Sequence, residues 1–207
     1  MKALLINGSP NAHGCTFTAL GEVEKSLRQE GIETEIFQLG KEPLRGCLGC
    51  GACKKSGRCA FSDGNVNQAL DILKGCQALV VGSPVYYASP NGALIAFLDR
   101  LFYAGGLDGH KVGAAVVSAR RAGTTAALDV LNKYFLISGM PIAPSQYWNM
   151  VHGNTPQEVL EDLEGLQVMR VLGRNIAYLM KCMRAGRDAG ILPPAPEQKR
   201  ERTNFIR

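Results

Sequence analysis

Short apolar runs alternate with longer segments of helical periodicity along most of this chain. Residues 78–82 and 112–117 are continuous apolar runs, which is typical of strands buried on both faces of a parallel sheet. Parallel strands need long crossover connections, and the segments between these runs place apolar residues three or four positions apart. The pattern predicts an α/β fold, in which right-handed βαβ units form one doubly wound parallel sheet with helices on both faces.

Five strands and five main helices are expected from this alternation. Strands are expected at residues 3–6, 33–39, 78–82, 112–117 and, with the weakest pattern, 141–147. Helices are expected at residues 16–30, 66–73, 91–103 and 124–136. A capping box at residues 155–158 predicts one long final helix that runs towards residue 184.

Length and composition indicate one globular domain without a membrane or nucleic-acid role. The chain has 207 residues, of which 46% are hydrophobic and 20% charged, an ordinary globular balance. No signal-peptide pattern, membrane-length apolar run or nucleic-acid-binding motif is found, so a cytoplasmic protein is expected. Because cytoplasmic thiols stay reduced, the seven cysteines favour metal or redox roles over disulfides.

The loop after the first expected strand has the features of a phosphate site. Residues 7–16 lead from a strand into a helix, and Ser9, Asn11 and Thr16 add polar side chains. A helix N-terminus in this setting offers backbone N–H groups and a positive end to an anion. The loop lacks the lysine of an ATP site and the glycine pattern of a dinucleotide site. It predicts a singly phosphorylated ligand, with an ordinary capped turn as the alternative.

Two further loops are expected at the same edge of the sheet. Residues 82–92 carry Tyr86 and Tyr87, whose flat rings suit contact with a planar ligand, and residues 118–125 offer backbone N–H groups beside two arginines. Each loop alone is as consistent with packing or a solvated surface. Because ligands bind beyond the carboxyl ends of such strands, the three loops together indicate a ligand site.

Four cysteines form a compact motif between the second strand and the second helix. Cys47, Cys50, Cys53 and Cys59 have the spacing C-x2-C-x2-C-x5-C, which suits an iron–sulfur cluster or a tetrahedral zinc. Zinc sites usually use two separated pairs of ligands, so the cluster is favoured, and free thiols remain the alternative. We expect the motif at the same sheet edge as the three loops, where it would serve electron transfer.

These motifs resemble a known family over about residues 1–176. Gly8-Ser9-Pro10 with Thr16, the loop 82–87 and the glycine loop after Ser118 resemble the flavodoxin-like NAD(P)H-dependent FMN reductases. The cysteine motif resembles that of the iron–sulfur flavoproteins, which carry FMN and a [4Fe–4S] cluster. The resemblance implies a five-stranded flavodoxin-like sheet of order 2-1-3-4-5. In that order the second strand is an edge strand, so a cluster there would be displaced from the flavin and could exchange electrons with a neighbouring subunit.

The resemblance also assigns cofactor contacts by position. Asn11 stands where related proteins often have an arginine, which weakens neutralisation of the phosphate. The implied phosphate contacts are Ser9, Asn11, Cys15 and Thr16; the implied isoalloxazine contacts are Pro84, Val85, Tyr86, Tyr87, Ser118, Ala119, Arg120 and Gly123; the implied cluster ligands are Cys47, Cys50, Cys53 and Cys59.

The expected function is that of an FMN-dependent oxidoreductase or electron-transfer flavoprotein. It would move electrons between NAD(P)H, or a reduced ferredoxin-like carrier, and an acceptor, by flavin chemistry that needs no catalytic side chain. The alternatives are a cluster-free NAD(P)H:flavin or quinone reductase and a non-enzymatic flavodoxin-like carrier. The sequence pI of about 8.9 argues against the carrier, because flavodoxins have acidic surfaces.

The last expectations concern boundaries and assembly. Residues 1–186 form the expected FMN-binding domain, with a cysteine-rich loop at 46–60, and residues 187–207 form an extended basic tail. The long final helix and this tail lack an evident partner in the core, so a homodimer or homotetramer is expected.

Overall fold

The computed structural model describes residues 1–105, 107, 109–192 and 194. One sheet with the order β2-β1-β3-β5-β6 runs through the molecule, and a short strand, β4, pairs with β3 outside this path. The five strands of the path are parallel, whereas β4 is antiparallel to β3. The order 2-1-3-4-5 expected for five parallel strands is therefore confirmed. The strands are β1 (Lys2–Asn7), β2 (Glu33–Gln38), β3 (Ala78–Tyr86), β4 (Ser89–Pro90), β5 (Val112–Ala119) and β6 (Met150–His152).

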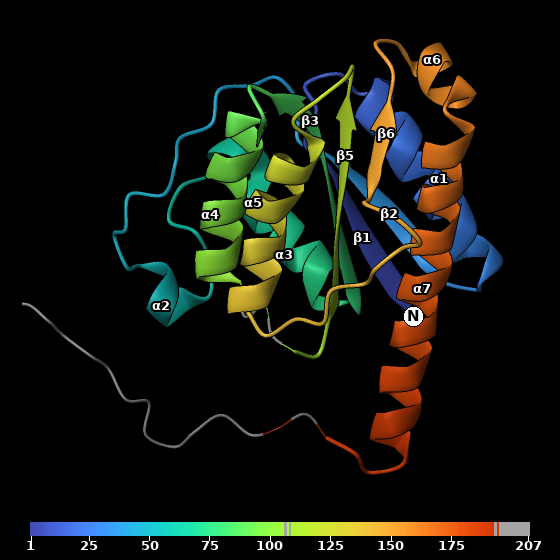
Figure 1. The fold of residues 1–207 in the computed structure, drawn as a ribbon. Coiled ribbons are helices and arrows are strands. Elements are labelled where there is room, and N and C mark those ends of the chain that lie inside the picture. Colours follow the sequence, from blue (N-terminus) through green and yellow to red (C-terminus); the bar gives the residue numbers. More distant parts are fainter. Residues whose placement is uncertain (106, 108, 193, 195–207) are drawn as a thin grey trace, which may run out of the picture.

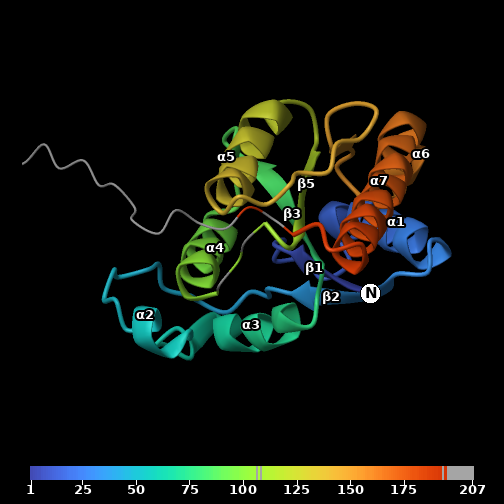
Figure 2. The same ribbon diagram turned by 90° about the horizontal axis from the view of Figure 1, so that it is seen from below.

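Helices cover both faces of this sheet (Figures 1 and 2). α1 and α7 lie on one face, and α3, α4 and α5 lie on the other. No helix in the described part of the chain combines the length and apolar character needed to cross a membrane. The helices are α1 (Cys15–Gln29), α2 (Cys53–Ser56), α3 (Val66–Lys74), α4 (Gly92–Ala104), α5 (Thr124–Ile137), α6 (Pro156–Glu161) and α7 (Leu163–Asp188), with a 3-10 turn at Asp63–Asn65.

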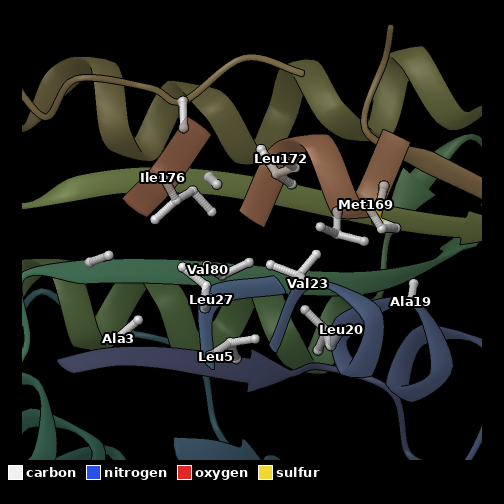
Figure 3. Packing of buried hydrophobic residues seen from close by; sticks show 14 of the residues in the cluster. Ala3, Leu5, Ala19, Leu20, Val23, Leu27, Val80, Met169, Leu172 and Ile176 are labelled. Atoms are coloured by element: carbon white, nitrogen blue, oxygen red, sulfur yellow. The ribbon is translucent and has the colours of Figure 1, made fainter. Parts of the chain in front are cut away.

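Alternation along the central strands divides the core into two layers. Leu5 of β1 and Val80 of β3 face α1 and α7, where they pack with Leu27 and Ile176 (Figure 3). Leu4, which points to the other face of the sheet from Leu5, packs with residues of α3, α4 and α5. Full burial of one such side chain stabilises the fold by about 1.5–3 kcal/mol. The two layers hold the carboxyl ends of the parallel strands in fixed positions.

The fifth parallel strand lies later in the chain than the sequence pattern suggests. In the segment 141–147, Ile142 forms an isolated bridge with Gly113, and the regular pairing with β5 comes from Met150–His152. Pro141 and Pro144 lack the N–H group that a ladder requires, so this segment cannot form a continuous strand. The expectation of a strand at 141–147 is wrong, although the number and order of the parallel strands are right.

The expected final helix is divided at Asp162. The Asp162 carboxylate accepts a hydrogen bond from the backbone N–H of Gly165 at 2.9 Å and so caps a second helix, α7. The expected helix start is present, since Thr155 Oγ1 accepts from the N–H of Glu158 at 3.2 Å, while Glu158 Oε2 accepts from the N–H of Asn154, one residue before the cap, at 2.6 Å. α7 continues to Asp188. Most of the expected tail, at positions 193 and 195–207, falls outside the described residues.

Candidate functional site

Three loops meet at the carboxyl edge of the sheet. The backbone N–H of Gly8 donates to the carbonyl of Gly82 at 2.9 Å, which joins the loop after β1 to the middle of β3. The Asn91 side-chain amide donates to the carbonyl of Gly8 at 2.7 Å. Thr16 Oγ1 lies 2.8 Å from Ser118 Oγ, which joins the start of α1 to the end of β5. The convergence expected from the sequence is therefore present.

A buried asparagine shapes the first loop. Asn7 is fully buried; its Oδ1 accepts from the N–H of Ser9 at 3.2 Å, and its Nδ2 donates to Gln38 Oε1 at 2.6 Å. Ser9 Oγ in turn accepts from the N–H of Asn11 at 3.1 Å. The loop leads into α1, whose N-cap, Gly14, provides no side-chain acceptor. The first-turn N–H groups of α1 therefore remain available to an anion at a positive helix end.

The second loop is a tight hairpin with a strained tip. β3 runs to Tyr86 and turns back into β4, so that Tyr87 and Ala88 both have positive φ, 50° and 58°. Such a turn normally uses asparagine and glycine, and each non-glycine residue there costs about 1–2 kcal/mol. The Tyr87 side chain is fully exposed. Strain retained around an exposed aromatic ring points to a role in binding.

A glycine fits the third loop against this hairpin. Gly123 has φ +88°, and a Cβ atom there would lie 2.7 Å from the Cα of Ala88. Since that neighbour is backbone, a side chain at position 123 would push the two loops apart. Gly123 therefore sets the distance between the tip of the hairpin and the N-terminus of α5.

The residues assigned to the cofactor surround this edge at different depths. Cys15 has its Sγ 3.6 Å from the carbonyl of Gly153, and burial raises the pKa of its thiol, which keeps it neutral. Its backbone N–H is therefore the more suitable contact. Of the assigned residues, Ser9, Thr16, Ser118 and Ala119 are buried, Cys15, Pro84, Val85 and Gly123 are half-buried, and Asn11, Tyr86, Tyr87 and Arg120 are exposed.

Sequence reasoning missed the residues that hold these loops in place. Asn7, Gln38 and Asn91 contribute the hydrogen bonds described above, and Asn91 also caps α4 by accepting from the N–H of Ala93 at 3.0 Å. An asparagine directly after an apolar strand, as at Asn7, is the signal that could have found the first of them. Gln38 carries no such signal, since its contact depends on the pairing of β1 with β2.

The four motif cysteines line one cavity of about 200 Å³, together with Lys54 and Arg100. The lining contains two cations and no carboxylate. In the part of the chain that the structure describes, no three His, Cys, Asp or Glu side chains are grouped closely enough to hold a metal ion. The donor set fits a thiolate-ligated iron–sulfur cluster or zinc in kind, and ligation requires the cysteines to draw closer together.

The cysteine cavity does not lie at the sheet edge where the three loops meet. Its lining includes Arg100 and Ala104 of α4, which come 8 and 12 residues after Gly92 and so lie about 12 and 18 Å further along the helix axis. Figure 1 shows the chain leaving β2 and passing outside α4 to α2, near the opposite end of that helix. The expectation that the motif shares the edge of the loops is wrong, because the connection after β2 is long and is attached to the far part of α4.

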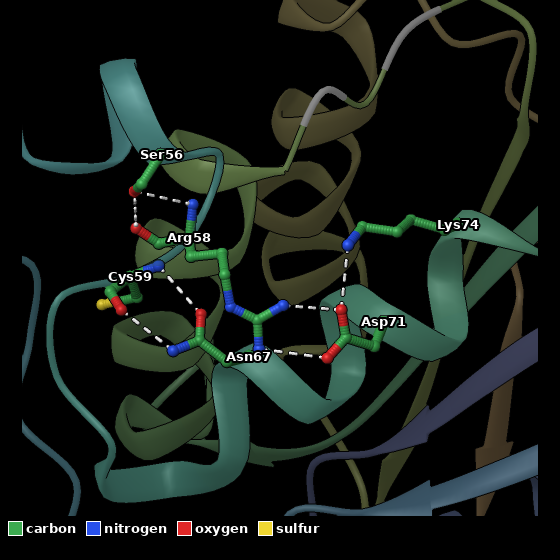
Figure 4. Close-up of polar contacts among 6 residues, drawn as sticks. All are labelled: Ser56, Arg58, Cys59, Asn67, Asp71 and Lys74. Carbon is green, nitrogen blue, oxygen red and sulfur yellow. Dashed lines mark hydrogen bonds and ion pairs between the residues drawn. The ribbon is translucent and has the colours of Figure 1, made fainter.

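Side chains of α3 bind the end of residues 46–60, called here the cysteine segment (Figure 4). Cys59 and Asn67 exchange two hydrogen bonds of 2.9 Å, one through each backbone polar group of the cysteine. Arg58 makes a two-pronged ion pair with Asp71 at 2.7 and 3.0 Å. Hydrogen bonds from Arg58 and Lys74 hold the pKa of Asp71 well below its usual range. The two Asn67 bonds therefore fix the backbone of the last cysteine, whereas the Arg58–Asp71 pair is exposed and contributes little.

A larger cavity, of about 610 Å³, lies between α5 and the segment 142–149. It is lined by Thr125, Leu128 and the exposed rings of Tyr147 and Trp148. It shares Thr125 with the end of the third loop and no residue with the cysteine motif, so it adjoins the loops on the β6 side of the sheet.

Comparison with known proteins identifies the family. The model of the NADPH-dependent FMN reductase family matches residues 1–155, which include all three loops and the cysteine motif. The chain belongs to this family. Its membership makes FMN its cofactor and makes the protein an FMN-dependent oxidoreductase.

Relatives place the chain near one subgroup of the FMN reductases. An iron–sulfur flavoprotein of Methanocaldococcus jannaschii is 31% identical over 89% of this chain and 100% of its own length. Another, from Methanosarcina thermophila, is 23% identical over 91% of this chain and all of its own length. The fold matches that of an archaeal flavodoxin, with TM-score 0.61, 19% identity, and coverage of 87% of this chain and 99% of the other. That last similarity shows the fold alone.

Proposed function

We propose that this FMN reductase family member moves electrons between NAD(P)H, or a reduced ferredoxin-like carrier, and an acceptor, and that its four motif cysteines hold a [4Fe–4S] cluster. Flavin binding is supported above all by the convergence of the three loops through the Gly8–Gly82 and Thr16–Ser118 contacts. The cytoplasm, where thiols stay reduced, is the compartment that suits the cysteines. Bound FMN supplies the redox chemistry, in one- or two-electron steps.

The first loop and the start of α1 hold the phosphate in this proposal. Ser9 and Asn11 contribute side-chain donors, and Cys15 and Thr16 contribute backbone N–H groups. The Thr16 hydroxyl is already paired with Ser118, so its role is to fix the loop. The loop contains no lysine or arginine, so neutral donors and the helix end contribute most of the binding.

The other two loops hold the ring system. Pro84, Val85, Tyr86 and Tyr87 of the second loop would line the isoalloxazine, joined by Ser118, Ala119, Arg120 and Gly123 of the third loop. Backbone N–H groups there stabilise the negative charge that reduction places on the ring. These groups and the exposed Tyr87 ring also limit the access of water.

The cysteine cavity supports the cluster through its donor set and its charge. Four thiols and two cations without a carboxylate suit a thiolate-ligated anion. The displacement of the cavity along α4 favours electron exchange with the flavin of a neighbouring subunit, and therefore a homodimer or homotetramer. A cluster-free NAD(P)H:flavin or quinone reductase is the second candidate, favoured by the absence of a closed ligand group among the described residues.

Anaerobic purification separates these candidates. FMN in equal ratio to the chain, with iron, sulfide and an EPR signal after reduction, supports the two-cofactor protein, whereas FMN without iron leaves the cluster-free reductase. Steady-state oxidation of NADH and NADPH with quinones or free flavin as acceptors distinguishes an enzyme from a carrier. Sedimentation of the holoprotein as a monomer contradicts the oligomer.

A further inference from the structure

Arg100 is the most deeply buried charged side chain of the described chain, at 2% exposure. It lies in α4 among apolar residues such as Leu98 and Leu101. Burying a guanidinium is costly unless its charge and its N–H groups are all satisfied. The question is what the protein gains by placing this cation beneath the cysteine segment.

All five N–H groups of Arg100 are used, and every acceptor belongs to the cysteine segment or its flanks. Nη1 donates to the carbonyl of Arg45 at 3.2 Å and to Asp63 Oδ2 at 3.0 Å. Nη2 donates to the carbonyls of Phe61 and Asp63, both at 3.0 Å. Arg100 thus joins the residue that precedes the motif to the residues that follow it, and closes residues 46–60 into a loop on α4.

The fifth bond points directly at a sulfur. Nε of Arg100 donates to Cys59 Sγ at 3.2 Å. This is the cysteine whose backbone Asn67 also holds, so both the position and the orientation of its sulfur are fixed. The other three cysteines line the same cavity with Arg100.

We propose that Arg100 is a positioning residue for the cysteine site: it closes the segment, orients Cys59 Sγ through the Nε–H···S hydrogen bond, and offsets the negative charge of a thiolate-bound cluster. This inference rests on the proposed cluster. Hydrogen bonds to ligand sulfur atoms and nearby positive charge favour the more negative, reduced form of a cluster and so raise its reduction potential. Residues that orient ligands typically change metal affinity about 10- to 100-fold when they are removed.

The planar fork distinguishes Arg100 from a simple cation. A lysine in its place keeps the charge but cannot reach the Arg45 carbonyl, Asp63 and Cys59 Sγ at once. Arg100→Lys therefore tests the hydrogen-bond geometry, and Arg100→Met tests geometry and charge together. Arg58→Met is the matched control, because Arg58 adjoins Cys59 in sequence and its guanidinium bonds to the exposed Asp71 carboxylate rather than to a sulfur.

The experiment is anaerobic reconstitution of the FMN-loaded protein with iron and sulfide, followed by iron and sulfide analysis and a redox titration monitored by EPR. We expect Arg58→Met to match the wild type. Arg100→Met should load at least about 10-fold less cluster at limiting iron. Arg100→Lys should load partly, with a reduction potential lower than that of the wild type. FMN content should be unchanged in all variants.

The outcomes separate the two proposals. A wild-type protein that takes up no iron refutes the proposed cluster, and the role of Arg100 falls with it. A wild type that loads, beside Arg100→Met and Arg100→Lys variants with the same loading and potential, refutes the role of Arg100 alone. If Arg100→Met does not fold, the loading and potential of Arg100→Lys against Arg58→Met decide the question.

Discussion

Thr16 Oγ1 and Ser118 Oγ lie 2.8 Å apart, although 102 positions separate them in the sequence. Both residues are nearly fully buried, at 1% and 4% exposure, so water cannot replace the bond. This contact fixes the start of α1, proposed to hold the phosphate, relative to the end of β5, proposed to border the flavin ring. This buried hydrogen bond therefore joins the two halves of the proposed cofactor site.

Replacing Thr16 by valine should weaken both stability and FMN binding. The change leaves the buried Ser118 hydroxyl unpaired, which costs about 1–3 kcal/mol, and it frees the first loop from β5. Urea unfolding of the apoprotein and FMN titration by fluorescence measure the two effects. Ser26→Ala is the control, because Ser26 is equally buried and donates to the Arg170 carbonyl at 2.9 Å, away from the site. It should lower stability alone; equal FMN affinity in Thr16→Val and Ser26→Ala would contradict the prediction.

Gly123→Ala should reduce FMN affinity more than its backbone strain alone explains. The new Cβ would lie 2.7 Å from Ala88 Cα and displace the hairpin, whereas at Gly139, with φ +68°, a Cβ meets nothing within 4 Å. Both variants carry the cost of positive φ, about 1–2 kcal/mol. Melting temperatures and FMN dissociation constants should show similar strain but a binding loss only in Gly123→Ala. A binding loss of the same size in Gly139→Ala would argue against the hairpin contact.

Ala88→Gly should stabilise the apoprotein. Relief of the left-handed strain at Ala88, about 1–2 kcal/mol, exceeds the entropy cost of adding a glycine to the unfolded chain, about 0.4–1 kcal/mol. The same substitution at Ala126, an exposed residue inside α5, should destabilise by about 0.5–1 kcal/mol. Thermal unfolding of the pair should therefore give shifts of opposite sign, and a lower melting temperature for Ala88→Gly would refute the strain.

The fold could be predicted because its signal is local. The apolar runs at β3 and β5 read as buried strands without any knowledge of their partners, and the capping box at Thr155 marks a helix start. β6 could not be found in this way, since a strand of three residues has too few positions to show a pattern. The break at Asp162 was likewise hidden, because an aspartate inside a helical pattern is only weakly unfavourable.

The meeting of the three loops at one sheet edge was predictable for the same reason, whereas the position of the cysteine site was not. Strand ends place their own loops, so the loops after β1, β3 and β5 had to lie at one edge once the strand order was known. The cysteine segment is placed instead by Arg100, a residue 41 positions after Cys59. In the sequence that arginine stands in an apolar helix and shows no connection to the motif.

Single Cys→Ser substitutions at the four motif positions should each lower the iron content of the protein without loss of FMN. The reason is that the three loops share no residue with the cysteine cavity. Iron and flavin are assayed on the same anaerobic preparation. Cys182→Ser is the matched control, since Cys182 is exposed on α7, outside the motif, and should keep full iron. Wild-type iron content in all four motif variants would exclude the proposed ligand set.

The cysteine segment should loosen in acid as Asp63 becomes protonated. A hydrogen bond from the backbone N–H of Arg45 at 2.8 Å, and then the side-chain bond from Arg100, hold the pKa of Asp63 below its ordinary value of 3.8. A carboxylate whose pKa is lowered by folding stabilises the native state fully above its unfolded pKa. That contribution is lost as the pH falls from about 3.8 through the lower folded value.

Asp63→Asn isolates this effect, because the amide keeps an acceptor oxygen but carries no charge. At pH 7 the variant should exchange the backbone amide protons of residues 45–63 faster than the wild type. Below pH 3.8 the difference should shrink, since the wild type then loses the same charge. Hydrogen exchange followed by mass spectrometry from pH 7 downwards measures the difference both above and below the pKa of Asp63. A difference that stays constant across this range would show that the charge of Asp63 does not hold the segment on Arg100.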